Sequence, residues 1–255
     1  MIKVNDIFDT LCALAPLELQ MEFDNAGFLL GHAEAPVETV LLALDVTDEV
    51  IDEAIERGAQ LIVSHHPLIF TPPRSITDTD AAGRRLLKLI EQRIAVISMH
   101  TNLDIAAGGV NDVLIEALGA KAEGPLDEEG CGRVGELDEA MSLPDFLARC
   151  REKLPAEGLR YVDAGRPVKR LAVMGGSGAD AIERAAALGC DTYVTADIKY
   201  HRFQKALELG LNLIDADHFG TENPVIPALA KTLSARFPAL RVLVSERHRA
   251  IIHFA

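Results

Sequence analysis

The chain has 255 residues, of which 49% are hydrophobic and 25% charged, a composition typical of a globular protein with one large or two modest cores. Its formal net charge of −14 repels phosphate backbones at long range, which argues against general nucleic-acid binding. Its four cysteines form no CxxC pair, and no apolar stretch is typical of a signal peptide or membrane span, so we expect a cytoplasmic protein with reduced thiols.

Short apolar strands alternate with amphipathic helices through the first half of the chain. The spacing of apolar residues predicts a buried strand over 39–45, a helix over 47–59, a strand over 61–64, a helix over 80–93 and a strand over 95–100. An alternation of this kind produces right-handed crossovers and a mostly parallel sheet.

The second half repeats the alternation. Its predicted elements are a strand over 170–176, a helix over 178–189, a strand over 192–197, a helix over 201–209 and a strand over 211–217, with one or two more strands within 241–254. Matching Gly58 to Gly189 overlays the two halves without gaps and aligns His66 with Asp197. This match indicates a weak internal duplication.

Residues 121–168 interrupt the alternation with segments rich in glycine, proline and acidic residues. We place a domain change near residue 125. The sequence therefore predicts an α/β protein with two related α/β domains and mostly parallel sheets. The first domain spans 1–125 and is completed by the C-terminal segment, and the second spans 126–255.

Two adjacent histidines, His65 and His66, follow the strand over 61–64 and directly precede Pro67. Ligands gather outside the carboxyl ends of strands in α/β sheets, and the turn before the proline allows both imidazoles to reach one cavity. Imidazole ligates zinc, iron and manganese, so adjacent histidines suit adjacent ions. Taken alone, the pair is equally compatible with a surface or capping role.

Two further loops place polar side chains at strand ends. His100 and Asp104 follow one strand in the first domain, and His218 and Glu222 follow another in the second, four residues apart where a helix begins. Each loop alone has an ordinary explanation, such as a turn aspartate, a structural histidine or a first-turn glutamate favoured by the helix dipole. The three loops together offer a donor set that suits two divalent ions sharing one water.

Seven segments of the chain carry a resemblance to a known family. They are DNAGFLLG at 24–31, LLALDVT at 41–47, VSHHPLIF at 63–70, MHTNLD at 99–104, GGVND at 108–112, TADIKYH at 195–201 and DADHFGTE at 215–222. In order and spacing they resemble the NGG-interacting-factor-like proteins, also called GTP cyclohydrolase I type 2 homologues, in the short form without an inserted domain.

This resemblance covers essentially the whole chain and has specific implications. It implies two α/β domains facing a central cleft and a ring-shaped homohexamer. It also implies a two-metal site whose ligands are His65, His66, Asp104, His218 and Glu222. The sequence departs from the family pattern at none of these ligand positions.

Several neighbouring residues are further candidates. Asp45 ends its strand beside the histidine pair and could orient an imidazole or cap the next helix. Lys199 and His201 follow a strand end and could contact an anionic substrate or shuttle a proton; His100 is the other candidate shuttle. A solvated lysine and a helix-start histidine are the ordinary alternatives. The Gly175–Gly178 turn could bind phosphate, but it lacks the P-loop pattern and a tight turn is favoured.

The residues and the resemblance together predict a dinuclear metal-dependent hydrolase that acts on a small anionic molecule. The resemblance suggests a nucleotide substrate, and the donor types suit two divalent ions of zinc, iron or manganese. The alternative is a metal-binding scaffold or regulatory interaction protein without turnover. We expect neither a membrane nor a nucleic acid among its partners.

Overall fold

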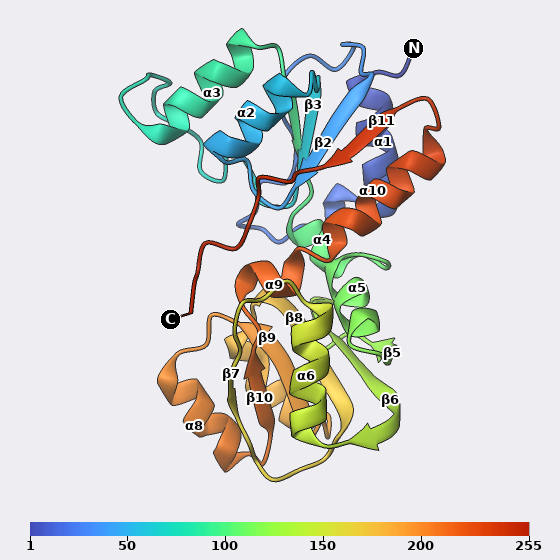
Figure 1. The fold of residues 1–255 in the computed structure, drawn as a ribbon, viewed down its shortest axis with the longest axis vertical. Coiled ribbons are helices and arrows are strands. Elements are labelled where there is room, and N and C mark those ends of the chain that lie inside the picture. The colour runs from blue at the N-terminus through green and yellow to red at the C-terminus, as the bar shows by residue number, and fades with distance from the viewer. Residues whose placement is uncertain (255) are drawn as a thin grey trace. The chain divides into compact units, whose positions relative to one another are not determined.

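The computed structural model describes residues 1–254, which form two compact units (Figure 1). Unit 1 comprises residues 1–106 and 226–249, and unit 2 comprises residues 107–225 together with the described residues from 250 onward. The chain therefore leaves unit 1 and returns to it near its C-terminus. Among residues 1–254, every helix is too short or too polar to traverse a lipid bilayer.

Unit 1 is built on a mostly parallel sheet. Its elements are α1 (Val4–Leu14), a 3-10 turn (Leu17–Leu19), β1 (Gly27–Leu30), β2 (Thr39–Ala43), α2 (Asp48–Glu56), β3 (Leu61–Ser64), α3 (Ala81–Glu91), β4 (Ala95–Ser98), α4 (Thr101–Ile105), α10 (Val225–Arg236), which begins at the unit boundary, and β11 (Arg241–Val244). The strand order is β1-β4-β3-β2-β11, and only the β1–β4 pairing among these described strands is antiparallel. The alternation predicted for this half is confirmed.

Helices cover both faces of this sheet, which explains the continuous apolar runs in its strands. Figure 1 shows α2 and α3 on one face and α1 and α10 on the other. Every residue of β2, β3 and β4 is buried, as expected for strands covered on both sides. Leu41, Ile62 and Val96 pack with residues of α2 and α3 into one core cluster. Thr47 caps α2 by accepting from the Val50 amide at 3.3 Å.

Unit 2 carries a mixed sheet. Its elements are α5 (Val110–Ala117), β5 (Ala120–Gly124), β6 (Arg133–Met141), α6 (Leu143–Lys153), β7 (Arg160–Val162), β8 (Val168–Ser177), a 3-10 turn (Ala179–Ala181), α7 (Ile182–Ala187), β9 (Thr192–Ala196), α8 (Tyr200–Glu208), β10 (Asn212–Asp215) and α9 (His218–Glu222). The strand order is β5-β6-β8-β9-β10-β7. The neighbours β8, β9 and β10 run parallel, whereas β5, β6 and β7 join by antiparallel pairings, so the parallel arrangement expected here is limited to the centre.

The segment 121–168 accounts for the antiparallel part of this sheet. It forms most of β5 and all of β6, α6 and β7. Gly135 lets β6 lie against β5, since a Cβ there would be 2.1 Å from the Lys121 carbonyl oxygen. Ser142 caps α6 by accepting from the Asp145 amide at 3.3 Å, and Phe146 of α6 lies in the core of the unit. The domain change expected near residue 125 thus falls inside unit 2. The C-terminal segment forms β11 at 241–244 and no further strand among its described residues.

Candidate metal-binding clusters

Three histidines of unit 1 converge at the carboxyl ends of two neighbouring strands. His65 and His66 follow β3, and His100 is the N-cap of α4 after β4. Because β3 and β4 are parallel and pair Ser64 with Ser98, their following loops leave the sheet side by side. One ligand atom from each histidine lies within 4.8 Å of the others, which is close enough to share a metal ion.

The tautomer of His65 is set by its hydrogen bond to the backbone. Its Nδ1 lies 2.8 Å from the Met99 carbonyl oxygen, which can only accept, so Nδ1 carries a proton and Nε2 is the nitrogen able to ligate. That Nε2 lies 3.6 Å from Oδ1 of Asp104, a residue of α4. His65 is fully buried. The sequence-predicted donors of unit 1 are therefore brought together.

Asp45 stands behind His66 and links it to the C-terminal segment. Its Oδ1 lies 2.7 Å from His66 Nδ1, and its Oδ2 lies 2.9 Å from Nε2 of His248. Burial by itself raises the pKa of Asp45, but the hydrogen bonds from His248 and His66 outweigh it and leave that pKa well below its usual range. Asp45 thus contacts an imidazole of the histidine pair, and its orienting role stays a prediction. His248 had no sequence signal, because it lies 203 residues from Asp45.

Asp24 contacts His100 in the same way as Asp45 contacts His66. Its Oδ1 lies 2.7 Å from His100 Nδ1, and its Oδ2 accepts from the amide of Thr101 at 3.0 Å. Burial raises the pKa of Asp24, whereas the hydrogen bonds from His100 and Thr101 lower it, and the net result is a pKa of about 2. The sequence offered a family-like segment at Asp24 but no physical role. The role depends on a contact across 76 residues.

A second cluster lies in unit 2, where α9 begins. His218 and Glu222 are one turn apart on α9, and His218 Nε2 lies 3.1 Å from Glu222 Oε2. His218 Nδ1 lies 2.7 Å from Oδ2 of Asp197, which follows β9. Burial lowers the pKa of His218, but its contacts with Asp197 and Glu222 raise it to about 10. The spacing of four residues therefore does bring both side chains to one side of the helix start, as predicted.

Unusual backbone geometry surrounds this second cluster. Asp197 and Asp217 have left-handed φ angles of 56° and 67°, and Asp217 caps α9 by accepting from the Gly220 amide at 3.2 Å. Gly176 also has a left-handed φ of 64°, and a Cβ there would lie 2.2 Å from Glu222 Oε1. Such conformations gather where a site holds side chains in fixed positions.

The Gly175–Gly178 turn is not arranged as an anion site. The amides of Gly175, Gly176 and Gly178 donate to side-chain oxygens of Asn111, Thr221 and Thr195, respectively. These donors are already engaged within the fold, so the turn has a structural function. The interpretation as a tight turn is therefore the one that the contacts support.

The other sequence candidates lie at different places. Lys199 is the exposed N-cap of α8, and His201 is exposed in the first turn of that helix. Within residues 1–254, His100 belongs to a group able to share a metal ion and His201 does not. Of the two candidate proton shuttles, the structure thus places His100 in a cluster.

An exposed aromatic pair lies beside the unit 1 cluster and was not anticipated. The ring centroids of Phe23 and Phe70 lie 6.4 Å apart. The ring centroids of Phe70 and His100 lie 6.1 Å apart, and the two ring planes are nearly perpendicular, at 86°. The side chain of Asn25 ties the two loops together by donating to the Ile69 carbonyl oxygen at 2.5 Å. The exposed fractions of Phe23 and Phe70 are 64% and 48%, which is unusually high for phenylalanine.

Known proteins resemble the chain along nearly its full length. The family Duf34/NIF3 (NGG1p interacting factor 3) matches residues 2–250. A GTP cyclohydrolase 1 type 2 homolog of Clostridium perfringens (strain 13 / Type A) is 39% identical over 242 residues, which cover 92% of both chains. A GTP cyclohydrolase 1 type 2 homolog of Streptomyces coelicolor is 36% identical over 236 residues, covering 88% of this chain and 83% of its own.

Solved structures show the same fold. The crystal structure of a Bacillus cereus protein related to NIF3 aligns with a TM-score of 0.90 at 28% identity, covering 100% of this chain and 99% of the other. Reduced HcgD from Methanocaldococcus jannaschii aligns with a TM-score of 0.85 at 30% identity, covering 96% and 98%. From the match over residues 2–250 and these near-complete relatives, the chain belongs to the Duf34/NIF3 (NGG1p interacting factor 3) family.

Proposed function

We propose that the protein is a cytoplasmic metal-dependent hydrolase in which the two clusters hold two divalent metal ions. The proposed ligands are His65, His66, Asp104, His218 and Glu222. One observation carries this proposal: every histidine of both clusters has its Nδ1 paired with a carbonyl or carboxylate oxygen. Metal-binding histidines characteristically have such an outer partner, because it orients the ring and directs the other nitrogen to the metal.

The donor chemistry fits zinc, iron(II) or manganese. Imidazole and carboxylate together suit these ions, and the sequence contributes no thiolate to either cluster. Bound ions of this kind activate water and stabilise negative charge on reacting oxygens. The chain's own carboxylates orient the rings: Asp45 contacts His66, a proposed ligand, and Asp24 contacts His100, each at 2.7 Å. His100, the member of the unit 1 cluster outside the proposed ligand set, is the proposed proton shuttle.

The proposed substrate is a small anion with a planar ring, such as a nucleotide. Two cations attract an anion, and the pair Phe23 and Phe70 offers an exposed aromatic surface beside His100 on which a ring can stack. The name shared by the relatives, GTP cyclohydrolase 1 type 2 homolog, is consistent with a nucleotide. The homohexamer implied by the resemblance stays a prediction, which the solution mass of the purified protein tests.

Elemental analysis tests the metal proposal directly. The protein is purified without chelator or histidine tag, beside a His65→Ala/His218→Ala variant and a His201→Ala/His253→Ala control that removes two exposed histidines. We expect about two ions per chain in the parent and the control and far fewer in the cluster variant. No retained metal in the parent after reconstitution with zinc, iron(II) and manganese would refute the proposal.

Turnover distinguishes the enzyme from the scaffold. The metal-loaded parent is screened for hydrolysis of nucleoside triphosphates and phosphomonoesters, with the His65→Ala/His218→Ala variant as the blank. Turnover that depends on the clusters supports the hydrolase. A protein that retains its metals and turns over none of these substrates favours the scaffold or regulatory alternative.

A further inference from the structure

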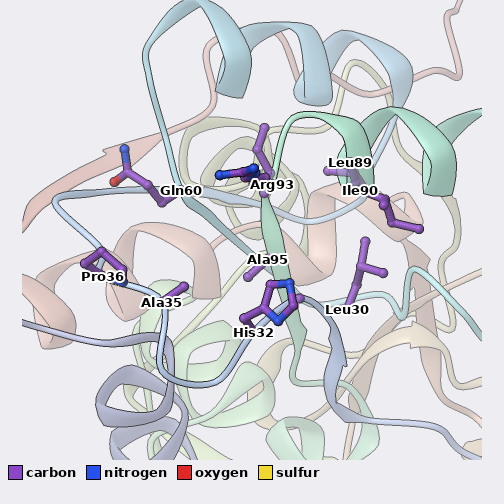
Figure 2. A pocket seen from close by; sticks show the side chains of 11 residues that line it. Leu30, His32, Ala35, Pro36, Gln60, Leu89, Ile90, Arg93 and Ala95 are labelled. Carbon is purple, nitrogen blue, oxygen red and sulfur yellow. The ribbon is translucent and has the colours of Figure 1, made fainter.

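Unit 1 contains a cavity at the end of its sheet opposite to the histidine cluster. The cavity has a volume of about 700 Å³ and lies where β1 ends and β4 begins (Figure 2). Ala95 begins β4 at this cavity, and His100 follows the other end of the strand, so roughly 16 Å of extended chain separates the two sites. The volume is within the usual range for small-molecule sites.

The lining of the cavity is apolar with a basic edge. Leu89 and Ile94 line it and are buried. Leu30 and Ile90 contribute further aliphatic surface (Figure 2). No acidic side chain lines it, as far as residues 1–254 extend, although the chain has 39 aspartates and glutamates. A local site without carboxylates, in a chain of net charge −14, is therefore suited to an anion.

The basic edge consists of Arg93 and His32, both exposed. In the part of the chain that the structure describes, neither side chain forms a hydrogen bond or an ion pair. The amide of Gln60 is already used, because its Oε1 accepts from the backbone amides of Glu38 and Thr39. The guanidinium of Arg93 is thus the charged group that the cavity can offer to a ligand.

The backbone conformation at Arg93 favours glycine, which indicates that the arginine side chain has a functional role. Arg93 has a left-handed φ of 55° directly after α3, with its amide donating to Ile90 and the next amide to Leu89. The same position after four other helices is a left-handed glycine: Gly58, Gly119, Gly189 and Gly210. Glycine adopts this conformation at lower free energy than arginine does, so the fold alone favours glycine here.

The remaining left-handed residues support this argument. Apart from Arg93, the non-glycine residues with positive φ among residues 1–254 are Asp197 and Asp217, and both hold the unit 2 cluster. At these two residues, the strained backbone thus occurs where the side chain holds a candidate site in place.

We propose that the cavity binds a small carboxylate with a hydrocarbon chain. The carboxylate pairs with the guanidinium of Arg93, whose planar donors match two carboxylate oxygens, and the hydrocarbon chain is buried against Leu30, Leu89 and Ile90. The C-terminal end of α3 adjoins the site, and its partial negative charge repels a doubly charged phosphate more strongly than a singly charged carboxylate.

Titration calorimetry with octanoate tests the proposal. Acetate is the control probe that lacks the hydrocarbon chain, and octan-1-ol is the control probe that lacks the charge. We expect saturable binding of one octanoate per chain and at least tenfold weaker binding of the other two. Arg93→Gly should weaken octanoate binding at least tenfold and yet unfold at a higher urea concentration, because glycine relieves the left-handed backbone. Arg84→Ala, which removes an arginine of α3 that does not line the cavity, should leave octanoate binding unchanged.

The combination of lost binding and gained stability excludes a loss caused by unfolding. Unchanged octanoate binding in Arg93→Gly, equal binding of octan-1-ol, or no octanoate binding by the parent would each overturn the proposal. Methyl NMR signals of Leu30 and Ile90 provide a second check, since octanoate should shift them. If they shift with protein concentration and not with octanoate, the face is a contact between copies and the proposal is wrong.

Discussion

At the scale of single residues, the most informative feature is a set of carboxylates that stand behind the histidines. Asp45, Asp24 and Asp197 each approach an imidazole Nδ1 at 2.7 Å. Each carboxylate has a lowered pKa and so stays ionised at neutral pH. A fixed anion at Nδ1 keeps a proton there and directs Nε2 toward a ligand, so the fold orients each ring for metal binding.

Removing one of these carboxylates should weaken metal binding without unfolding the protein. In Asp45→Ala, His66 loses the contact that orients it, and we expect metal affinity to fall by about 10- to 100-fold. Competition with a chelator of known affinity measures the change. Asp48→Ala is the matched control, because Asp48 is an exposed carboxylate at the start of α2 that pairs with Arg85. Equal metal affinity in both variants would show that Asp45 has no orienting role.

At the scale of elements, the C-terminal segment is joined to α2 by one buried carboxylate. Glu53 is 1% exposed and accepts from the Ser245 hydroxyl at 2.5 Å and from the backbone amides of Glu246 and Arg247. Nε of Arg57, the C-cap of α2, lies 3.0 Å from Oε1 of Glu53. Burial raises the pKa of Glu53, but these hydrogen bonds and then Arg57 lower it below its ordinary value. The ionised form therefore stabilises the return of the chain.

The stabilisation by Glu53 should depend on pH. Its folded-state pKa is lower than that of the unfolded chain, so the contribution is present above about pH 4.3 and is lost as the pH falls through the folded-state value. We expect Glu53→Gln to lower the free energy of unfolding by about 1–3 kcal/mol at pH 7, with a smaller difference at pH 3. Urea unfolding at both pH values measures this. A difference that grows towards low pH would contradict the assignment.

At the scale of the whole molecule, each unit has its own hydrophobic core, and unit 1 is discontinuous in sequence. Residues 226–249 return to unit 1, where β11 pairs with β2 in parallel and the amide of Ser245 donates to the Leu42 carbonyl at 2.8 Å. The stability of residues 226–249 should therefore follow the core of unit 1 and not that of unit 2, which precedes them in the chain.

Hydrogen exchange after core truncation tests this organisation. Phe146→Ala opens the core of unit 2, at an expected cost of about 3–5 kcal/mol, and Leu41→Ala opens that of unit 1, at about 2–5 kcal/mol. We expect amides of β11 to exchange faster in Leu41→Ala and to keep their protection in Phe146→Ala. The reverse pattern would show that the C-terminal segment depends on unit 2.

The sequence by itself determined the elements whose apolar spacing is local. Strands β3 and β4, helices α2 and α8 and the strand-end position of His65 could all be predicted, because burial on one or both faces is recorded in neighbouring residues. The predicted overlay of the two halves also matches a real similarity: α2 and α7 both connect parallel strands and both end before a left-handed glycine.

Only the tertiary structure decided which distant segments meet. The antiparallel strand β6 was missed because its glycine and acidic residues obscure the alternation of apolar and polar residues. The need for glycine at position 135 becomes visible only when β6 lies against the backbone of β5. Asp24 and His248 acquire roles through contacts across 76 and 203 residues. Such pairings depend on the packing of whole elements, which no local pattern contains, so the histidines were visible in the sequence while the groups that orient them were not.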